Sequence, residues 1–263
     1  MSLSAVQFER AAHLEFSHAR LQRLSSLGDA QLRALLGGDL AEAAQWIASA
    51  AQCDVIEAQL CWGRMLLAGQ GVARDLALAL RWFERAAALG SAEAWNMIGR
   101  CQENAWSVPH DATAAACSYR RAAEAGHDWG QYNLGNLLFD GRGVPLDRAA
   151  ALRWYLQAAT QGHGRAMNLV GRCLEQGWGC ASRPAEAAYW YRCSAESGYF
   201  RGQYNHALVL LETCQVEQAT QWLRRAALAG NADMRRAIVA RLSRESGPTL
   251  RELAAEVNAL EDG

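Results

Sequence analysis

The segment with the clearest chemical suggestion runs from Leu137 to His163 and holds Gly141 and Gly143, one residue apart, before an amphipathic run. A Gly-x-Gly ahead of a helix can cradle phosphate groups with backbone amides, and Gly-Arg-Gly can suggest nucleic-acid binding. The phosphate cradle needs a strand before the glycines. Here a run with helical periodicity precedes them, so we predict a bend between two helices.

Side chains that could perform acid–base, nucleophilic or metal chemistry are scattered along the chain. All 26 basic residues are arginine, which excludes Schiff-base chemistry and a P-loop lysine. His127 and His163 occupy equivalent loop positions and do not form a metal pair, while Glu103 and Glu175 lie on separate predicted helices, too far apart to act on one bond. We therefore expect no catalytic residue, no metal and no cofactor.

Eight cysteines form no Cys-x-x-Cys pair, which favours free thiols in a reducing compartment. Cys193, at an exposed position of a predicted helix, is the best candidate for a reactive thiol. An enzyme or redox role through Cys193 or Cys180 stays as a third alternative. His206 replaces an apolar core residue, and we expect a satisfied core histidine there.

The composition is that of a folded protein, with 51% apolar and 20% charged residues and a net charge of −1. Such a charge balance gives no positive field for nucleic acid or an anionic membrane. The N-terminal sequence lacks the apolar core of a signal peptide, and the apolar runs are too short to cross a bilayer. We predict a soluble, cytoplasmic protein that binds neither nucleic acid nor membrane.

A 36-residue period dominates the chain. Several independent series of residues share this step, which predicts tandem structural repeats that are stable only when stacked. The clearest series are Gly63, Gly99, Gly135 and Gly171; Gly90, Gly126, Gly162 and Gly198; Asp75, Asp111 and Asp147.

Each repeat has the pattern of two helices joined by a bend. In the third copy, the first helix places Gly130, Leu134, Leu137 and Leu138 on one apolar stripe. Gly141 suits a left-handed helix end, and Asp147 suits the N-cap of the second helix. That second helix is expected to direct Trp154, Ala158 and Ala159 inward and to end at Gly162.

The unit GQYNLGNLLFDGRGVPLDRAAALRWYLQAATQGH, from Gly130 to His163, resembles the Sel-one-like repeat (SLR) family, a relative of the tetratricopeptide repeats. The resemblance implies an all-α, right-handed superhelical α-α solenoid of helix–turn–helix repeats that acts as an adaptor or scaffold for another protein. Three copies depart from the pattern. The second has Ala105 and Ser107 in place of the loop glycines, and the fourth has Arg183 where Asp was expected and offers Ser182 as a cap. The last steps only 32 residues, from Trp190 to Trp222, lacks the Gly-x-Gly loop and is expected to turn as a plain tetratricopeptide unit would.

These observations predict one continuous solenoid domain with three parts. Residues 1–38 form an N-terminal helical cap, and residues 39–230 hold a partial first copy, four full copies and a shortened last copy. Residues 231–263 form a C-terminal helical cap with a polar outer side.

The resemblance implies a concave groove lined by the first helices, and residues predicted to lie opposite the core stripe are the candidate site. They combine a line of arginines, amides that could hold a peptide backbone and an aromatic stripe. Packing between helices is the favoured role for Tyr132, whereas packing and binding stay open for Trp129 and Phe139, and the arginines can equally be a solvated face. A small ligand or sugar fragment is the alternative occupant. The candidate partner-binding residues are Trp129, Phe139, Tyr132, Asn96, Asn168, Arg64, Arg100, Arg172 and Arg201.

Overall fold

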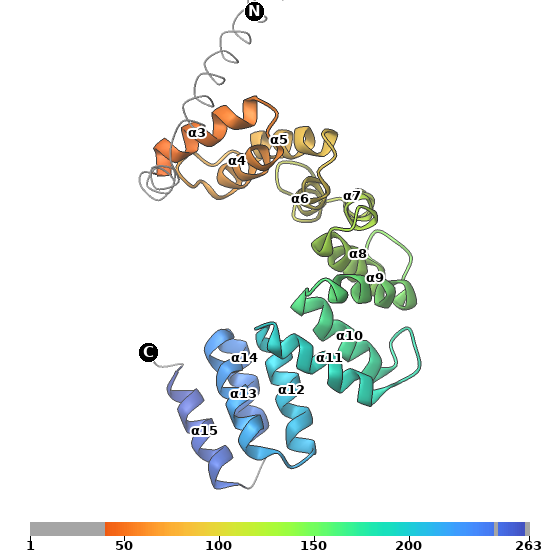
Figure 1. Cartoon of the computed structure of the whole chain (residues 1–263), viewed down its shortest axis with the longest axis vertical. Helices are drawn as coiled ribbons and strands as arrows, with labels where there is room; N and C mark the ends of the chain where they lie inside the picture. Colours follow the sequence, from red (N-terminus) through yellow and green to blue (C-terminus); the bar gives the residue numbers. More distant parts are fainter. Residues whose placement is uncertain (1–39, 245–246, 261–263) are drawn as a thin grey trace, which may run out of the picture. The chain divides into compact units, whose positions relative to one another are not determined.

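The computed structural model describes residues 40–244 and 247–260, which fold into thirteen helices with no strand among them (Figure 1). The N-terminal cap predicted for residues 1–38 lies outside the described residues. The chain divides into two compact units, Met1–Gly130 and Gln131–Gly263. None of the described helices is both long and apolar enough to span a membrane.

The helices alternate between first and second members of the predicted pairs, so the helix–turn–helix repeat is confirmed. A helix of the partial first copy, α3, is followed by five pairs: α4 with α5, α6 with α7, α8 with α9, α10 with α11, and α12 with α13. Their bounds are α3 Leu40–Gln52, α4 Ile56–Ala68, α5 Leu76–Ala88, α6 Ala92–Glu103, α7 Ala112–Glu124, α8 Asp128–Asp140, α9 Arg148–Thr160, α10 Gly164–Gln176, α11 Pro184–Glu196, α12 Phe200–Glu212 and α13 Val216–Ala229.

The loops within the repeats form as their sequence predicts. The Asp147 carboxylate accepts a hydrogen bond from the Ala150 amide at 2.8 Å and caps α9, and Asp75 and Asp111 cap α5 and α7 in the same way. Gly141 has a φ of +70°, the left-handed conformation that glycine adopts without steric cost.

Two irregular copies show how the loop tolerates substitution. Ala105 and Ser107 keep the left-handed conformation of the glycines that they replace, with φ of +56° and +69°. The prediction that Ser182 caps α11 is wrong, because its hydroxyl donates to the Glu175 carbonyl at 2.8 Å. Arg183 occupies the cap position without a side-chain bond, and Pro184 starts the helix with its fixed φ.

The last copy joins its two helices by a shorter turn without the Gly-x-Gly loop. Only three residues separate the end of α12 at Glu212 from the start of α13 at Val216. Cys214 adopts a φ of +58° in this turn, and the Gln215 amide donates to the Leu210 carbonyl at 2.8 Å.

At the centre of each full repeat, an aromatic ring of the second helix packs against a glycine of the first helix. In the third copy, a Cβ on Gly135 would lie 2.5 Å from Cε1 of Tyr155, a ring that is only 1% exposed. The prediction that Trp154 is the inward aromatic is wrong, since Trp154 is only half-buried. The next residue, Tyr155, faces the first helix instead, because Gly135 on that helix leaves room for its ring. The pairs are Gly63 with Phe83, Gly99 with Tyr119, Gly135 with Tyr155 and Gly171 with Tyr191.

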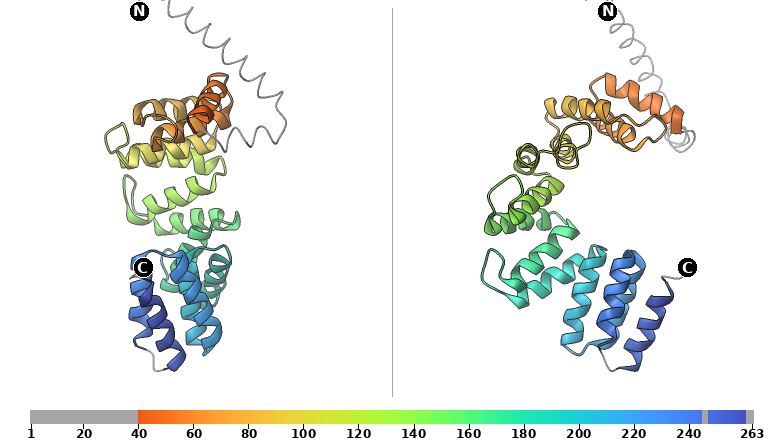
Figure 2. Two further views of the ribbon diagram at one scale, coloured as in Figure 1. Left: turned by 90° about the vertical axis from the view of Figure 1, so that its left-hand side faces the viewer. Right: turned by 180° about the vertical axis from the view of Figure 1, so that it is seen from behind.

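Two more helices follow the last repeat, α14 (Ala232–Leu242) and α15 (Pro248–Ala259). Figure 2 shows α13, α14 and α15 side by side, and the apolar cluster of the second unit continues through Ile238 and Leu242 to Leu253 and Val257. The role of these helices as a cap stays a prediction, as does the single continuous domain.

Replacing Gly171 by alanine should lower the free energy of unfolding by about 1–3 kcal/mol, because the added methyl group would overlap a packed ring. The new Cβ would lie 2.6 Å from Cδ1 of Tyr191. Combining G171A with Y191L copies the last repeat, where Ala207 and Leu223 occupy the two positions. We expect a favourable coupling of about 0.5–3 kcal/mol in this double-mutant cycle, measured by urea unfolding. Additive costs would contradict the proposed contact.

Restoring the loop glycines of the second copy should stabilise the protein. Ala105→Gly and Ser107→Gly each remove a side chain from a residue in the left-handed conformation. Each change should raise the free energy of unfolding by about 0.5–1 kcal/mol, which already allows for the greater entropy that glycine gives the unfolded chain. Thermal unfolding followed by circular dichroism measures the shift. Gly141→Ala, the reverse change at an equivalent conformation, should lower the melting temperature, and a rise would refute the argument.

Candidate functional site

Two arginines and two aromatic rings meet at one end of the first helices in the second unit. The guanidinium carbon of Arg148 lies 5.1 Å from the Phe139 ring centroid and 5.9 Å from that of Trp178. The guanidinium carbon of Arg172 lies 5.2 Å from the Trp178 ring centroid, and the two rings meet edge to face at 5.3 Å. We call Phe139, Arg148, Arg172 and Trp178 the arginine–aromatic cluster.

The repeat loops hold these four residues in place. Phe139 is in the last turn of α8, and Arg148 is the first residue of α9, directly after its capping aspartate. Trp178 follows α10 between Gly177 and Gly179, both with positive φ. A Cβ on Gly179 would lie 2.4 Å from the Arg148 carbonyl oxygen, so only glycine lets this loop approach the start of α9 so closely.

Neither arginine of the cluster has a carboxylate partner among the described residues. Arg148 and Arg172 are exposed and form no ion pair and no side-chain hydrogen bond within the part of the chain that the structure describes. The nearby Glu175 carboxylate instead accepts a hydrogen bond from the Tyr191 hydroxyl at 3.0 Å. Burial, and then this carboxylate, raise the pKa of Tyr191, which keeps the phenol protonated as the donor.

The other candidates in the second unit have different surroundings. Tyr132 stacks on His163 with ring centroids 4.9 Å apart, as expected for a packing residue. Asn168 is 4% exposed and accepts a hydrogen bond from the Asn205 amide at 2.7 Å. Arg201 is exposed, with its guanidinium carbon 5.8 Å from the Phe200 ring centroid.

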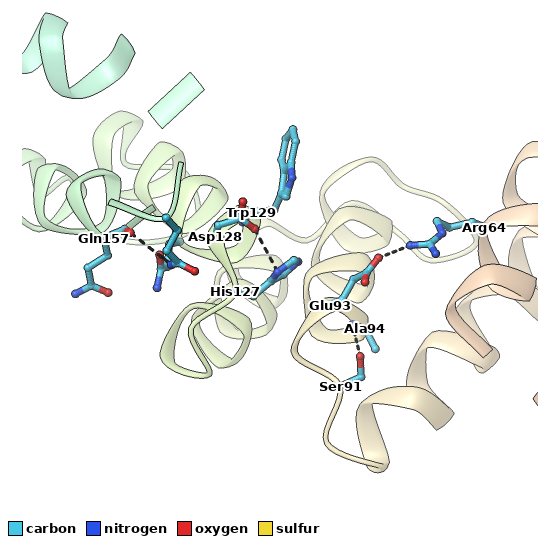
Figure 3. A network of polar contacts seen from close by, with 10 residues as sticks. Arg64, Ser91, Glu93, Ala94, His127, Asp128, Trp129 and Gln157 are labelled. Carbon is cyan, nitrogen blue, oxygen red and sulfur yellow. Dashed lines mark hydrogen bonds and ion pairs between the residues drawn. The ribbon is translucent and has the colours of Figure 1, made fainter. Parts of the chain in front are cut away.

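The first unit holds the remaining candidates, and Figure 3 shows part of this region. Arg64 forms an ion pair with Glu93, which neutralises it locally. Arg100 stacks over the Trp106 ring at 5.3 Å, while Asn96 is only 5% exposed. Trp129 is 41% exposed.

The prediction that Asn96 and Asn168 lie opposite the core is wrong. The position shared by Leu60, Asn96 and Asn168 was expected to lie opposite the core, yet all three side chains are buried. For Asn168 the reason is the neighbouring first helix, because the Asn205 side chain in α12 donates a hydrogen bond to Asn168 in α10. The Asn96 and Asn168 amides are therefore not displayed on the surface.

A second period, which spans two repeats, was not among the features predicted from the sequence. Trp106 and Trp178 lie 72 residues apart, and each stacks with the arginine six residues before it. Glu103 and Glu175 share the same spacing, and Glu103 accepts a hydrogen bond from the buried Tyr119 hydroxyl at 2.7 Å. Comparing alternate copies, rather than adjacent ones, would have revealed the Arg–Trp pairs.

Two histidines, His163 and His206, contact local structure. The His163 Nδ1 accepts a hydrogen bond from the Ala166 amide at 3.1 Å and caps α10, as the Ser91 hydroxyl caps α6 at 3.2 Å (Figure 3). His206 packs edge to face on Trp222, and burial lowers its pKa. Its Nδ1 is buried without a hydrogen-bond partner among the described residues, so the expectation of a satisfied histidine is wrong.

Two buried thiols are poor nucleophiles. Burial raises the pKa values of Cys101 and Cys173 to about 11, which disfavours the nucleophilic thiolate. Cys193 is half-buried rather than exposed. Among the described residues, no three His, Cys, Asp or Glu side chains gather into a group that could hold a metal ion.

Comparisons with known proteins agree with the repeat architecture. A protective antigen of uropathogenic Escherichia coli with an SLR fold is 27% identical with a TM-score of 0.69; the match covers 96% of this chain and 61% of that protein. A Sel1 repeat protein from Oxalobacter formigenes is 23% identical with a TM-score of 0.77 over 87% of this chain and 96% of that one. An immunity protein from Pseudomonas aeruginosa shares the fold at 17% identity and a TM-score of 0.53, over 79% of this chain and 80% of its own.

A comparison with curated proteins gave no match. The model of the Sel1 repeat matches residues 56–91, 92–127, 130–163, 164–199 and 215–231, which together make up more than half of the sequence. The chain therefore belongs to the Sel1 repeat family.

Proposed function

We propose that the protein is a non-catalytic adaptor that binds a peptide or helix of a partner protein on the exposed face of its first helices. Sel1 repeats are generally protein–protein interaction modules, which supports the class of function. The finer proposal rests on one observation, the arginine–aromatic cluster of the second unit.

This cluster has the properties of a binding surface rather than of a core. Its aromatic rings are half-buried and its guanidiniums are exposed, so apolar area and unpaired donors are displayed together. Binding energy at protein interfaces is concentrated in such aromatic and arginine residues. Because the rings already hold the arginines, less rotamer entropy is lost when a partner binds.

Other candidate residues enter the proposal according to their surroundings. Arg201 displays an exposed guanidinium in the first turn of α12. In the first unit, Trp129 and Arg100 display a large apolar side chain and a stacked guanidinium, whereas Arg64 must first leave Glu93. Asn96, Asn168 and Tyr132 support the helices and are not proposed as direct contacts.

The proposal includes the cytoplasmic location that the sequence predicts, and it excludes nucleic acid, membrane and any catalysed reaction. Its competitor is a regulatory module that binds a small ligand or sugar fragment on the same rings. A ligand that binds only the folded state raises the melting temperature, so a thermal-shift screen distinguishes the two. Stabilisation by sugars but not by peptides would favour the competitor.

Selection of random peptides displayed on phage against the whole chain tests the adaptor function. We expect enriched peptides that bind in fluorescence anisotropy and whose affinity falls about tenfold in Phe139→Ala, because the variant loses the ring that supports Arg148 and Trp178. Tyr189→Ala is the matched control, since it removes an exposed aromatic ring from a second helix. Both variants are checked by circular dichroism and melting.

Failure to enrich any peptide, or equal losses in Phe139→Ala and Tyr189→Ala, would reject the proposed surface.

A further inference from the structure

We infer that the arginine–aromatic cluster selects acidic partner segments, in which carboxylates stand beside an apolar side chain. This inference rests on the proposed adaptor function and names the chemistry of its partner. It goes beyond the family, because two members of the cluster, Phe139 and Arg148, depart from the residues that the other copies carry at the same positions.

The internal comparison of repeats shows how specific the cluster is. The positions equivalent to Phe139 hold Leu67, Glu103 and Glu175, and the positions equivalent to Arg148 hold Leu76, Ala112 and Pro184. Only the third repeat therefore brings an aromatic ring and a second arginine to the tryptophan loop of the next copy. In the first unit, Trp106 has a single stacked arginine, Arg100.

The charge arrangement favours an anionic ligand. Two guanidiniums lie within 6 Å of one indole centroid, and neither has an acidic partner among the described residues. Both positive charges lie beside the same indole ring, and an anion that binds at the cluster is attracted by both of them. Each planar guanidinium has N–H donors that match the two oxygens of a carboxylate.

Carboxylate suits the cluster better than phosphate. The exposed Glu175 carboxylate lies three residues from Arg172 and repels a dianionic phosphate more than a singly charged group. The start of α9 offers little more to an anion, because the Asp147 carboxylate already accepts from the Ala150 amide. The Phe139 and Trp178 rings add apolar contact, which fits a leucine-like neighbour of the acidic residue.

A matched pair of labelled, end-capped peptides tests the inference on the whole chain. One peptide alternates Glu with Leu, and the other carries Gln in place of each Glu. We expect the Glu peptide to bind about tenfold more tightly in fluorescence anisotropy at low salt. The difference in affinity between the two peptides should become smaller as the salt concentration rises from about 50 mM to about 200 mM, because salt screens exposed charges.

Charge-removing variants locate the effect. Arg148→Gln combined with Arg172→Gln should abolish the preference for the Glu peptide. Arg153→Gln combined with Arg225→Gln, at exposed arginines of α9 and α13, should preserve the preference, which controls for the loss of two positive charges. Circular dichroism confirms that each variant is folded.

Three outcomes would overturn the inference: no binding of the Glu peptide, equal binding of the two peptides, or equal effects of the cluster and control variants. Tighter binding of a phosphoserine peptide or an RNA oligonucleotide through Arg148 and Arg172 would overturn it as well. If phage selection yields peptides whose affinity is unchanged when Gln replaces Glu, only the acidic preference is rejected. If no peptide ligand is found at all, the adaptor function is rejected as well.

Discussion

The contact of an aromatic ring with a helical glycine is the constraint on which the repeats depend. Each ring occupies the space where a Cβ would stand, and its nearest atom lies 2.4–2.6 Å from the place of that Cβ, so the first helix can carry no larger residue there. Glycine costs about 1 kcal/mol in a helix, so its presence in four copies implies that ring packing outweighs this loss. Where the ring is replaced by Leu223, the glycine is replaced by Ala207, which keeps the total volume similar.

The same contact limits which residues can reach the surface. A buried tyrosine hydroxyl needs an acceptor. Glu103 and Glu175 provide this acceptor in the second and fourth copies. In the first full copy the ring is Phe83, which has no hydroxyl and needs no acceptor, and Leu67 occupies the position equivalent to Glu103. In the third copy, the Tyr155 hydroxyl donates to Asn136 at 2.9 Å. Because Asn136, one turn earlier, is the acceptor in this copy, the position of Phe139 does not have to supply one and can carry the aromatic ring of the proposed binding surface.

The period made most of the fold predictable, because helix ends, left-handed loop residues and Asp caps recur in register. The inward ring was not predictable by this route. Trp154 and Tyr155 are adjacent, both are aromatic and they differ by only about 100° around the helix. Burial of the Asn168 position was missed because a single helix pattern does not show the neighbouring first helix that covers it. The Trp178 stack follows a two-repeat spacing that adjacent copies conceal.

The residues that hold the repeats together are separate from the exposed residues of the proposed binding surface. The ring, the glycine and the loop conformations fix each helix pair, and they leave residues such as Arg148 and Arg172 with no role in the described core. Substitutions there cost little stability, since most exposed changes alter the free energy of unfolding by less than about 0.5 kcal/mol. The rigid loop still determines where the new side chains lie. Recognition can therefore change one repeat at a time, while the contact that holds every repeat together stays the same.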